Sequence, residues 1–239
     1  MKWFIPREHG AWAMLIVPYL IGMLATEVTL VHWFFFIGVL AFYFASAPLL
    51  TFVRQPKLLK TAVPSLFVYV LIGTIFTFPV LYLIPEIILI SLFILPFFIL
   101  NIVFAKLKKE RLFINDLCAI IALSFLVVIS YYIGSGTIET ITFILMTINI
   151  MFFTASVFHV KTLIRENGNK KFLMKSNVFH GFTVLIFVLL GMPMIALIFL
   201  ISSLKAWMMP KQKRYKPVQI GLIEIANSVI FVVGIGIIF

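Results

Sequence analysis

The chain has 239 residues, of which 63% are hydrophobic and only 11% are charged, and its formal net charge is +11. A soluble domain of this size has too little interior to bury so much apolar surface, so the composition excludes a soluble globular protein. The single cysteine, Cys118, excludes a disulfide framework and is expected to be a packing residue.

Apolar segments follow one another along the whole chain, with no soluble domain between them. A helix that crosses the bilayer needs about 20 mostly apolar residues. We therefore predict an all-α, polytopic membrane helix bundle with about nine transmembrane helices, which occupies residues 1–239 as a single domain. The expected spans are 11–27, 32–53, 62–82, 86–105, 113–133, 138–160, 177–191, 193–209 and 218–238. The seventh and eighth are short, and a re-entrant pair is the alternative there.

The lysines and arginines predict the orientation of these spans. Basic residues favour the cytoplasmic side of a membrane, most clearly in short loops. With nine spans and the N-terminus inside, all 19 Lys and Arg residues fall in the inside segments, and the outside loops carry Glu27, Glu86 and Glu139 instead. The sequence therefore predicts a protein of the inner (plasma) membrane with its N-terminus in the cytoplasm and its C-terminus outside.

The net positive charge also bears on partners. A basic cytoplasmic face attracts anionic lipid headgroups, so membrane lipids are the expected partners. Nucleic acid is not an expected partner, because these cations lie in short loops against the membrane. The four histidines and one cysteine follow no metal-binding spacing, so no metal ion and no cofactor are expected.

The first group of candidate residues is Arg7, Glu8 and His9, in the stretch PREHGAWAML just before the first span. Charged side chains at the mouth of a membrane helix need water, headgroups or partners. They either line a site, where Glu8 would pair with Arg111 or Lys161, or form an interfacial cap beside tryptophan anchors.

The second group lies in KLKKERLFINDLCA, where Glu110 and Arg111 precede Asn115 and Asp116 at the start of the fifth span. Arg111 and Asn115 are expected to share a helix face, because they are four residues apart. Asp116 is the only aspartate in the chain. It is either a functional ionisable group or a first-turn acid that the helix dipole favours. Asn101 in the fourth span adds a further polar candidate.

The third group is Ser156, His159, Lys161 and Arg165, at the inner end of the sixth span. His159 is either an interfacial side chain or a group that binds a ligand or transfers protons.

The fourth group is in the last span, where Glu224, Asn227 and Ser228 share one helix face. Glu224 lies about two turns inside the span and therefore needs a partner. The expected partners on the same side of the membrane are Arg7, Arg111 and Lys161.

The stretches REHGAWAMLIVPYLIG, KKERLFINDLCAIIALS and SVFHVKTLIRENGN resemble the YwiC-like family of bacterial membrane proteins. The resemblance covers almost the whole chain, and EHGAW and KER are its more specific parts. It implies a bacterial membrane protein but no particular reaction.

A more distant resemblance links LIVPYLIGMLA and FAKLKKERLFINDLC to UbiA-type prenyltransferases. It implies a UbiA-like bundle with active-site loops at 52–61 and 159–176. Those enzymes hold a Mg²⁺–diphosphate through two aspartate-rich motifs, because Mg²⁺ prefers carboxylate oxygens beside phosphate. The corresponding stretches here, TFVRQPKLLK and FHVKTLIREN, contain no aspartate, so Mg²⁺-dependent prenyl transfer is disfavoured.

Three functions remain open. The first is a protein that binds or modifies an isoprenoid or other anionic lipid, with Arg111, Lys161 and Arg165 at the headgroup. In that reading, Asp116, His159 or Glu224 would supply polar or acid–base groups. The second is a proton- or cation-linked transporter that uses Asp116 and Glu224. The third is an accessory membrane subunit.

Overall fold

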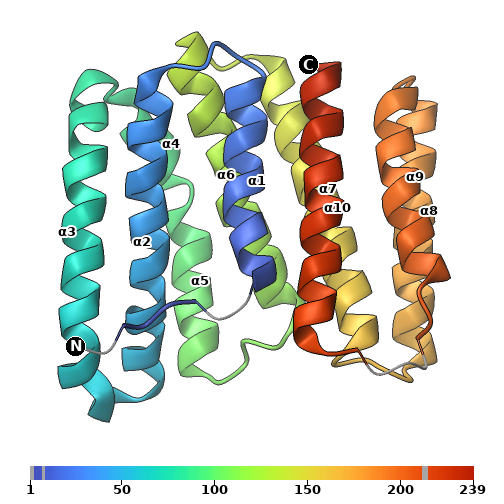
Figure 1. The fold of residues 1–239 in the computed structure, drawn as a ribbon, viewed down its shortest axis with the longest axis horizontal. Helices are drawn as coiled ribbons and strands as arrows, with labels where there is room; N and C mark the ends of the chain where they lie inside the picture. Colours follow the sequence, from blue (N-terminus) through green and yellow to red (C-terminus); the bar gives the residue numbers. More distant parts are fainter. Residues whose placement is uncertain (1–2, 7–8, 212–214) are drawn as a thin grey trace. The chain divides into compact units, whose positions relative to one another are not determined.

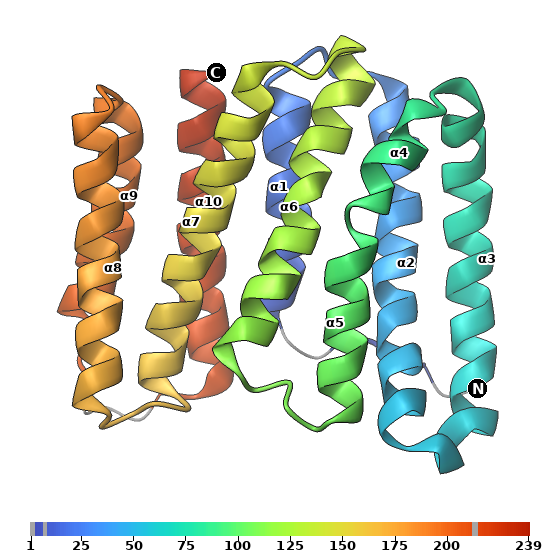
Figure 2. The same ribbon diagram turned by 180° about the vertical axis from the view of Figure 1, so that it is seen from behind.

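The structure is a computed structural model that describes residues 3–6, 9–211 and 215–239. Within these residues it contains α-helices, one short 3-10 helix and no strand. The helices are α1 (His9–Leu24), α2 (Leu30–Arg54), η1 (Pro56–Leu58), α3 (Leu59–Leu83), α4 (Glu86–Leu92), α5 (Leu95–Lys106), α6 (Phe113–Ser135), α7 (Thr140–Leu163), α8 (Lys170–Leu189), α9 (Pro193–Met208) and α10 (Pro217–Ile238). Figures 1 and 2 show them from opposite sides.

The chain divides into two compact units, which we call the N-terminal unit (Met1–Met146) and the C-terminal unit (Thr147–Phe239). The boundary between them falls inside α7. The single membrane domain expected from the sequence stays a prediction.

The prediction of an all-helical, multi-pass membrane protein is confirmed. Every expected span overlaps one or two helices, and within the described residues seven segments are long and apolar enough to cross a membrane. They are Leu30–Arg54, Pro56–Leu83, Glu86–Lys106, Phe113–Ser135, Thr140–Leu163, Lys170–Leu189 and Pro217–Ile238. Because α1 and α9 have only 16 residues each, crossing by these two helices stays a prediction.

The fourth span is not the continuous helix that the sequence predicted over 86–105. It consists of α4 and α5, which are separated at Phe93 and Ile94. Pro96 lies in the first turn of α5. Proline has no backbone N–H, and its ring clashes with the carbonyl four residues earlier, here that of Leu92. The break is therefore encoded locally by Pro96.

The seventh span begins at Lys170, seven residues earlier than the sequence suggested. Asn169 caps this end, because its side-chain oxygen accepts a hydrogen bond of 3.1 Å from the backbone N–H of Phe172. The sequence reading placed the lysines that follow in a loop, but their long stems let them occupy the first turns of a membrane helix. The resulting 20-residue α8 is long enough to cross alone, which disfavours a re-entrant seventh span.

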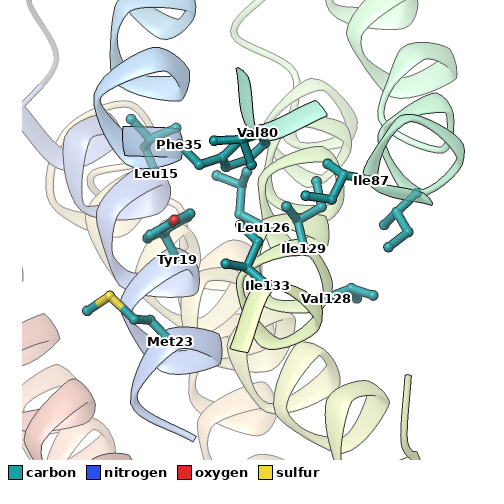
Figure 3. Packing of buried hydrophobic residues seen from close by; sticks show 11 residues of the cluster. Leu15, Tyr19, Met23, Phe35, Val80, Ile87, Leu126, Val128, Ile129 and Ile133 are labelled. Atoms are coloured by element: carbon teal, nitrogen blue, oxygen red, sulfur yellow. The ribbon is translucent and has the colours of Figure 1, made fainter. Parts of the chain in front are cut away.

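In the N-terminal unit, α1 packs against α6 and α2 packs against α3 (Figures 1 and 2). The cluster in Figure 3 joins buried side chains of α1, α2, α3, α4 and α6, with Tyr19 and Leu126 near its centre. Gly22 allows the close approach of α1 to α6, because a Cβ at this position would overlap Ser130 Oγ and the Val127 carbonyl. Small residues serve this purpose at helix contacts in membranes.

His32 is a polar link inside the N-terminal unit. Its Nδ1 accepts a hydrogen bond from the Thr29 backbone N–H at 3.1 Å, so Nε2 carries the proton and donates to the Ser130 carbonyl at 2.9 Å. The Tyr19 hydroxyl donates to the His32 carbonyl at 2.6 Å. These bonds satisfy the imidazole and join α2 to α1 and α6.

Aromatic rings pack the helices of the C-terminal unit together. Phe152 of α7 stacks on Phe231 of α10 with ring centroids 3.8 Å apart, and Phe187 of α8 lies 4.9 Å from Phe199 of α9. Both views place the loop after α7 and the loop after α9 at the same end of this unit. Lys205, near the end of α9, and Glu224, near the start of α10, lie towards that end.

Candidate functional site

Glu224 is the centre of a buried polar cluster in the C-terminal unit. Its side chain is only 6% exposed. Glu224 Oε2 accepts a hydrogen bond of 2.6 Å from Ser156 Oγ, and Glu224 Oε1 accepts one of 2.6 Å from Lys205 Nζ. A buried carboxylate is stable only when it is paired and hydrogen-bonded, and α7 and α9 supply those partners.

His159 connects this carboxylate to the loop that follows α9. Its ring is fully buried, and Nε2 lies 3.8 Å from Glu224 Oε1. On the other side of the ring, Nδ1 lies 3.2 Å from Lys211 Nζ. Lys211 also donates a hydrogen bond of 2.7 Å to the Ala206 carbonyl, which fixes its ammonium group at the end of α9.

The chemistry of Lys211 assigns the tautomer of His159. An ammonium group can only donate, so Nδ1 must accept the hydrogen bond from Lys211. In a neutral imidazole the proton is then on Nε2, which faces Glu224. The separation of 3.8 Å is longer than a hydrogen bond, and Nε2 has no other hydrogen-bond partner within the described residues.

We name the α7–α10 cluster by its five members, which are Ser156, His159, Lys205, Lys211 and Glu224. It contains two ammonium groups and one carboxylate. Partial burial, together with the like charge of Lys205, lowers the pKa of Lys211 to about 8. Lys211 lies in the loop between α9 and α10. Because its pKa is lowered, its ammonium group loses a proton more readily than that of an ordinary exposed lysine.

A second set of hydrogen bonds supports the cluster from the membrane interior. Asn227 Nδ2 donates to Ser202 Oγ at 2.9 Å, which ties α10 to α9 one turn beyond Glu224. Ser203 Oγ donates to the His180 carbonyl at 3.2 Å and so ties α9 to α8. His180 Nδ1 donates to the Ser176 carbonyl at 2.8 Å, because a carbonyl can only accept.

The structure thus unites predicted candidates from two parts of the sequence. Ser156, His159 and Glu224 meet directly, and Asn227 lies one helical turn away. Ser228 is also buried in α10. Of the neighbouring candidates, Lys161 is buried in the last turn of α7, whereas Arg165 is exposed in the turn that follows.

The sequence reading missed Lys205 and Lys211. It counted Lys205 as the border of a basic loop, although it lies three residues before the last residue of α9. The signal was available, because a lysine inside an apolar helix needs an anionic partner and Glu224 was a buried acid on the same side. Lys205 is a cationic partner of Glu224 within the C-terminal unit, and it was not among the partners expected from the sequence.

A second polar site lies at one end of the N-terminal unit. Arg54, the last residue of α2, pairs with Glu110 in the loop between α5 and α6, and Arg54 Nε donates to Glu110 Oε1 at 2.8 Å. Next to this pair is an open cavity of about 410 Å³. It is lined by three cationic side chains, one carboxylate and two other residues, namely Arg54, Lys108, Arg111, Glu110, Gln55 and Ala105.

The prediction that Arg111 and Asn115 share a helix face is wrong. Arg111 lies in the loop before α6 and lines the cavity, because the helix begins only at Phe113. Asn115 instead donates a hydrogen bond of 3.0 Å to the Glu110 carbonyl, and Asn101 donates one of 3.5 Å to the Asn115 carbonyl. These amides organise the turn between α5 and α6.

Asp116 is half-buried in the first turn of α6, the position where the helix dipole favours an acid. Arg7 and Glu8 lie outside the described residues, and the backbone of His9 begins α1.

Lys108 has an unusual backbone conformation beside the cavity. Its φ is +57°, in the left-handed region that glycine usually occupies. It follows the last turn of α5, where the Lys109 N–H donates to the Phe104 carbonyl at 2.8 Å and the Lys108 N–H donates to the Ala105 carbonyl at 3.1 Å. This is the Schellman arrangement. Gly191 occupies the same position after α8, with a φ of +71°.

The described residues contain no group of three or more His, Cys, Asp or Glu side chains that could hold a metal ion. Both polar sites are instead rich in cations. Their chemistry suits anion binding and proton exchange more directly than metal coordination.

Comparison with known proteins identifies the family. The family model described as YwiC-like protein matches residues 5–131. The chain is 32% identical over 232 residues to a protein of Bacillus subtilis (strain 168), "Uncharacterized protein YwiC", covering 97% of this chain and 96% of the relative. It is 30% identical over 231 residues to an "Uncharacterized protein" of Haemophilus influenzae, covering 97% of this chain and 96% of that relative. No solved structure matches the chain. The chain therefore belongs to the YwiC-like family of proteins.

Proposed function

We propose that this multi-pass membrane protein binds an anionic lipid headgroup, of the isoprenyl phosphate or diphosphate class, at the basic end of the N-terminal unit. The observation that carries the proposal is the open cavity of about 410 Å³ lined by Arg54, Lys108 and Arg111. Three cations around one cavity, with a single carboxylate among them, favour a ligand that bears more than one negative charge.

The arrangement of the arginines supports this ligand chemistry. Glu110 accepts from both Nε and a terminal nitrogen of Arg54, so the guanidinium group is held in place at the edge of the cavity. A planar guanidinium group suits the oxygens of a phosphate, and Arg111 supplies a second one. Lys108 adds a compact charge, which suits a phosphate without requiring one geometry.

The position of the cavity supports a lipid as the source of the phosphate. It lies at the end of α2 and at the end of the segment Glu86–Lys106, and both segments are long and apolar enough to cross a membrane. Headgroups lie at the ends of such segments, and apolar helix surface continues from there towards the bilayer centre. An isoprenoid chain would therefore find lipid-like surroundings while its headgroup occupies the cavity.

The same proposal places the basic loops on the cytoplasmic side of the plasma membrane. In each unit, the helix ends that carry lysine and arginine lie together (Figures 1 and 2). Basic loops favour the cytoplasmic side, so the N-terminus would be inside and, with nine crossings, the C-terminus outside. A UbiA-like bundle without aspartate-rich motifs remains the scaffold that this proposal assumes.

The experiment is a thermal-shift titration of the purified protein with an isoprenyl diphosphate, with and without Mg²⁺. A ligand that binds only the folded state stabilises it by about 2.7 kcal/mol at a concentration of 100 times its Kd. We expect stabilisation without Mg²⁺ that is lost in Arg111→Ala and kept in Lys109→Ala. Lys109 is the matched control, because it lies in the same loop but does not line the cavity.

Further titrations in the same experiment distinguish a lipid from a soluble phosphate as the ligand. Inorganic pyrophosphate should stabilise the protein less than the isoprenyl diphosphate, because the lipid adds apolar contact. Equal stabilisation by both would identify a soluble phosphate as the ligand. A strict requirement for Mg²⁺, or the absence of any shift, would contradict the proposal.

A second candidate function is proton- or cation-linked transport of a small molecule. The observation that favours it is Glu224, a buried carboxylate inside a membrane-spanning helix. Uptake of solute into sealed vesicles that is abolished by Glu224→Gln would support transport. Uptake that persists unchanged in that variant would exclude a role for this carboxylate.

A further inference from the structure

The α7–α10 cluster contains a series of three neighbouring proton-exchanging groups. Lys211 Nζ lies 3.2 Å from His159 Nδ1, and the opposite ring nitrogen lies 3.8 Å from Glu224 Oε1. Lys211 belongs to the loop after α9 and is half-buried, whereas His159 and Glu224 are buried. The series therefore runs from the end of the C-terminal unit into its interior.

We propose that Lys211, His159 and Glu224 form a proton relay between the loop after α9 and the buried carboxylate of α10. A proton leaves Lys211 Nζ and binds His159 Nδ1, while the proton on His159 Nε2 transfers to Glu224 Oε1. The ammonium group and the carboxylate become a neutral amine and a carboxylic acid, and the imidazole stays neutral in its other tautomer. No co-reactant is needed, and water at the loop returns a proton to Lys211.

The tautomer of His159 and the distance between His159 and Glu224 both suit this proton transfer. The contact with Lys211 fixes Nδ1 as the acceptor and leaves a proton on the nitrogen that faces Glu224. A shift of about 1 Å in the separation of 3.8 Å brings Nε2 within hydrogen-bond reach of Glu224. Catalytic hydrogen bonds are often long in the resting state and shorten only when transfer occurs.

The other charged and titratable groups around His159 define what the relay controls. Lys205 of α9 and His180 of α8 are near enough to act on it electrostatically, in addition to Lys211 and Glu224. Lys205 is held by the carboxylate of Glu224 at 2.6 Å. Protonation of Glu224 removes the negative charge that holds this lysine, so arrival of a proton weakens the contact of Lys205 with Glu224.

The experiment measures protonation of Glu224 in the full-length protein by infrared spectroscopy after a pH jump. Acidification should produce the carbonyl band of a protonated carboxyl group, and its absence in Glu224→Gln would assign the band. In His159→Phe we expect the rate of appearance to fall by about 100-fold, the lower range for a positioned proton-transfer group. Lys211→Arg should slow it in the same way, because arginine keeps the charge but does not release its proton.

Two variants serve as matched controls. His180→Phe also removes a buried imidazole from the unit, but His180 donates to the Ser176 carbonyl and stands outside the series. Lys216→Arg makes the same change as Lys211→Arg at an exposed lysine of the same loop. Both should keep the rate of the unchanged protein.

If His159→Phe does not fold, His159→Gln replaces it, because its amide is closer to imidazole in size and polarity. The proposal is overturned if no Glu224-dependent band appears while the protein stays folded. It is equally overturned if the rate is unchanged in both the His159 variant and Lys211→Arg. The relay is independent of lipid binding, since all of its residues lie in the C-terminal unit and the measurement contains no ligand.

Discussion

Lys205 donates a hydrogen bond of 2.6 Å to Glu224, and this contact joins α9 to α10 where both side chains are largely buried. Loss of one partner from a buried pair leaves an uncompensated charge, which costs about 3–5 kcal/mol. We therefore expect Lys205→Met to lower the free energy of unfolding by about 3 kcal/mol or more. Thermal or denaturant unfolding in detergent measures this loss.

The control for that prediction is a double variant. Lys205→Met combined with Glu224→Met removes both charges, so it should be more stable than Lys205→Met alone. Equal or lower stability of the double variant would show that the charge pair is not the source of the effect.

The ion pair between Arg54 and Glu110 should behave differently from the buried pair. Their side chains are 43% and 31% exposed, and water screens their attraction. We expect Glu110→Gln to change the free energy of unfolding by less than about 1 kcal/mol. A loss comparable to that of Lys205→Met would mean that the pair is part of the folded core rather than a positioning contact for Arg54.

The left-handed backbone of Lys108 predicts that glycine at this position is more favourable than a residue with a side chain. A side chain in the left-handed region costs about 1–2 kcal/mol relative to glycine. Lys108→Gly should therefore be about 1 kcal/mol more stable than Lys108→Ala, since both remove the same charge and only alanine keeps the strain. The matched control is Gly191→Ala, which should destabilise by a similar amount because Gly191 has a φ of +71°.

The close contact of α1 with α6 predicts that a larger residue in place of Gly22 destabilises the protein. A methyl group there meets Ser130 Oγ and the Val127 carbonyl, so the helices must separate. We expect Gly22→Ala to destabilise the protein by about 1–3 kcal/mol, the range for overpacked cores. Gly181→Ala is the control, because its nearest neighbour, Trp207 Cζ2, is 4.0 Å away. If both substitutions have the same effect, crowding is not the cause.

The lowered pKa of Lys211 predicts how stability depends on pH. The pKa falls from 10.5 to about 8 in the folded state, because burial and Lys205 disfavour the ammonium form. Between about pH 8 and 10.5 the unfolded chain binds more protons at this lysine than the folded protein does. Stability from this group therefore rises with pH in that window. The apparent Tm should rise more in the unchanged protein than in Lys211→Met, and equal profiles would contradict the shift.

Much of the fold was predictable because membrane helices leave a strong signal. Each span is a long apolar run, and the basic residues mark where runs end. The errors arose where local chemistry overrides that signal. Pro96 breaks a run that hydropathy treats as continuous, and Asn169 begins a helix inside a stretch that looks like a polar loop.

The candidate site was predictable in part for a similar reason. Glu224 and His159 stand out as ionisable groups in apolar helices, and the structure places them 3.8 Å apart. Lys205 and Lys211 were missed because they were counted among the basic residues that mark helix ends, although the place of Lys205 inside an apolar helix indicated an anionic partner. Their contacts depend on the packing of α9 against α10, which helical periodicity alone does not specify.

The break between α4 and α5 has a consequence for how the chain enters the membrane. With 7 and 12 residues, neither helix is long enough to cross a bilayer by itself. The insertion machinery must therefore accept Glu86–Lys106 as one apolar segment. We expect the two helices to enter the bilayer together, and because α6 contacts both of them, we expect the break to be fixed in place only when α6 has followed.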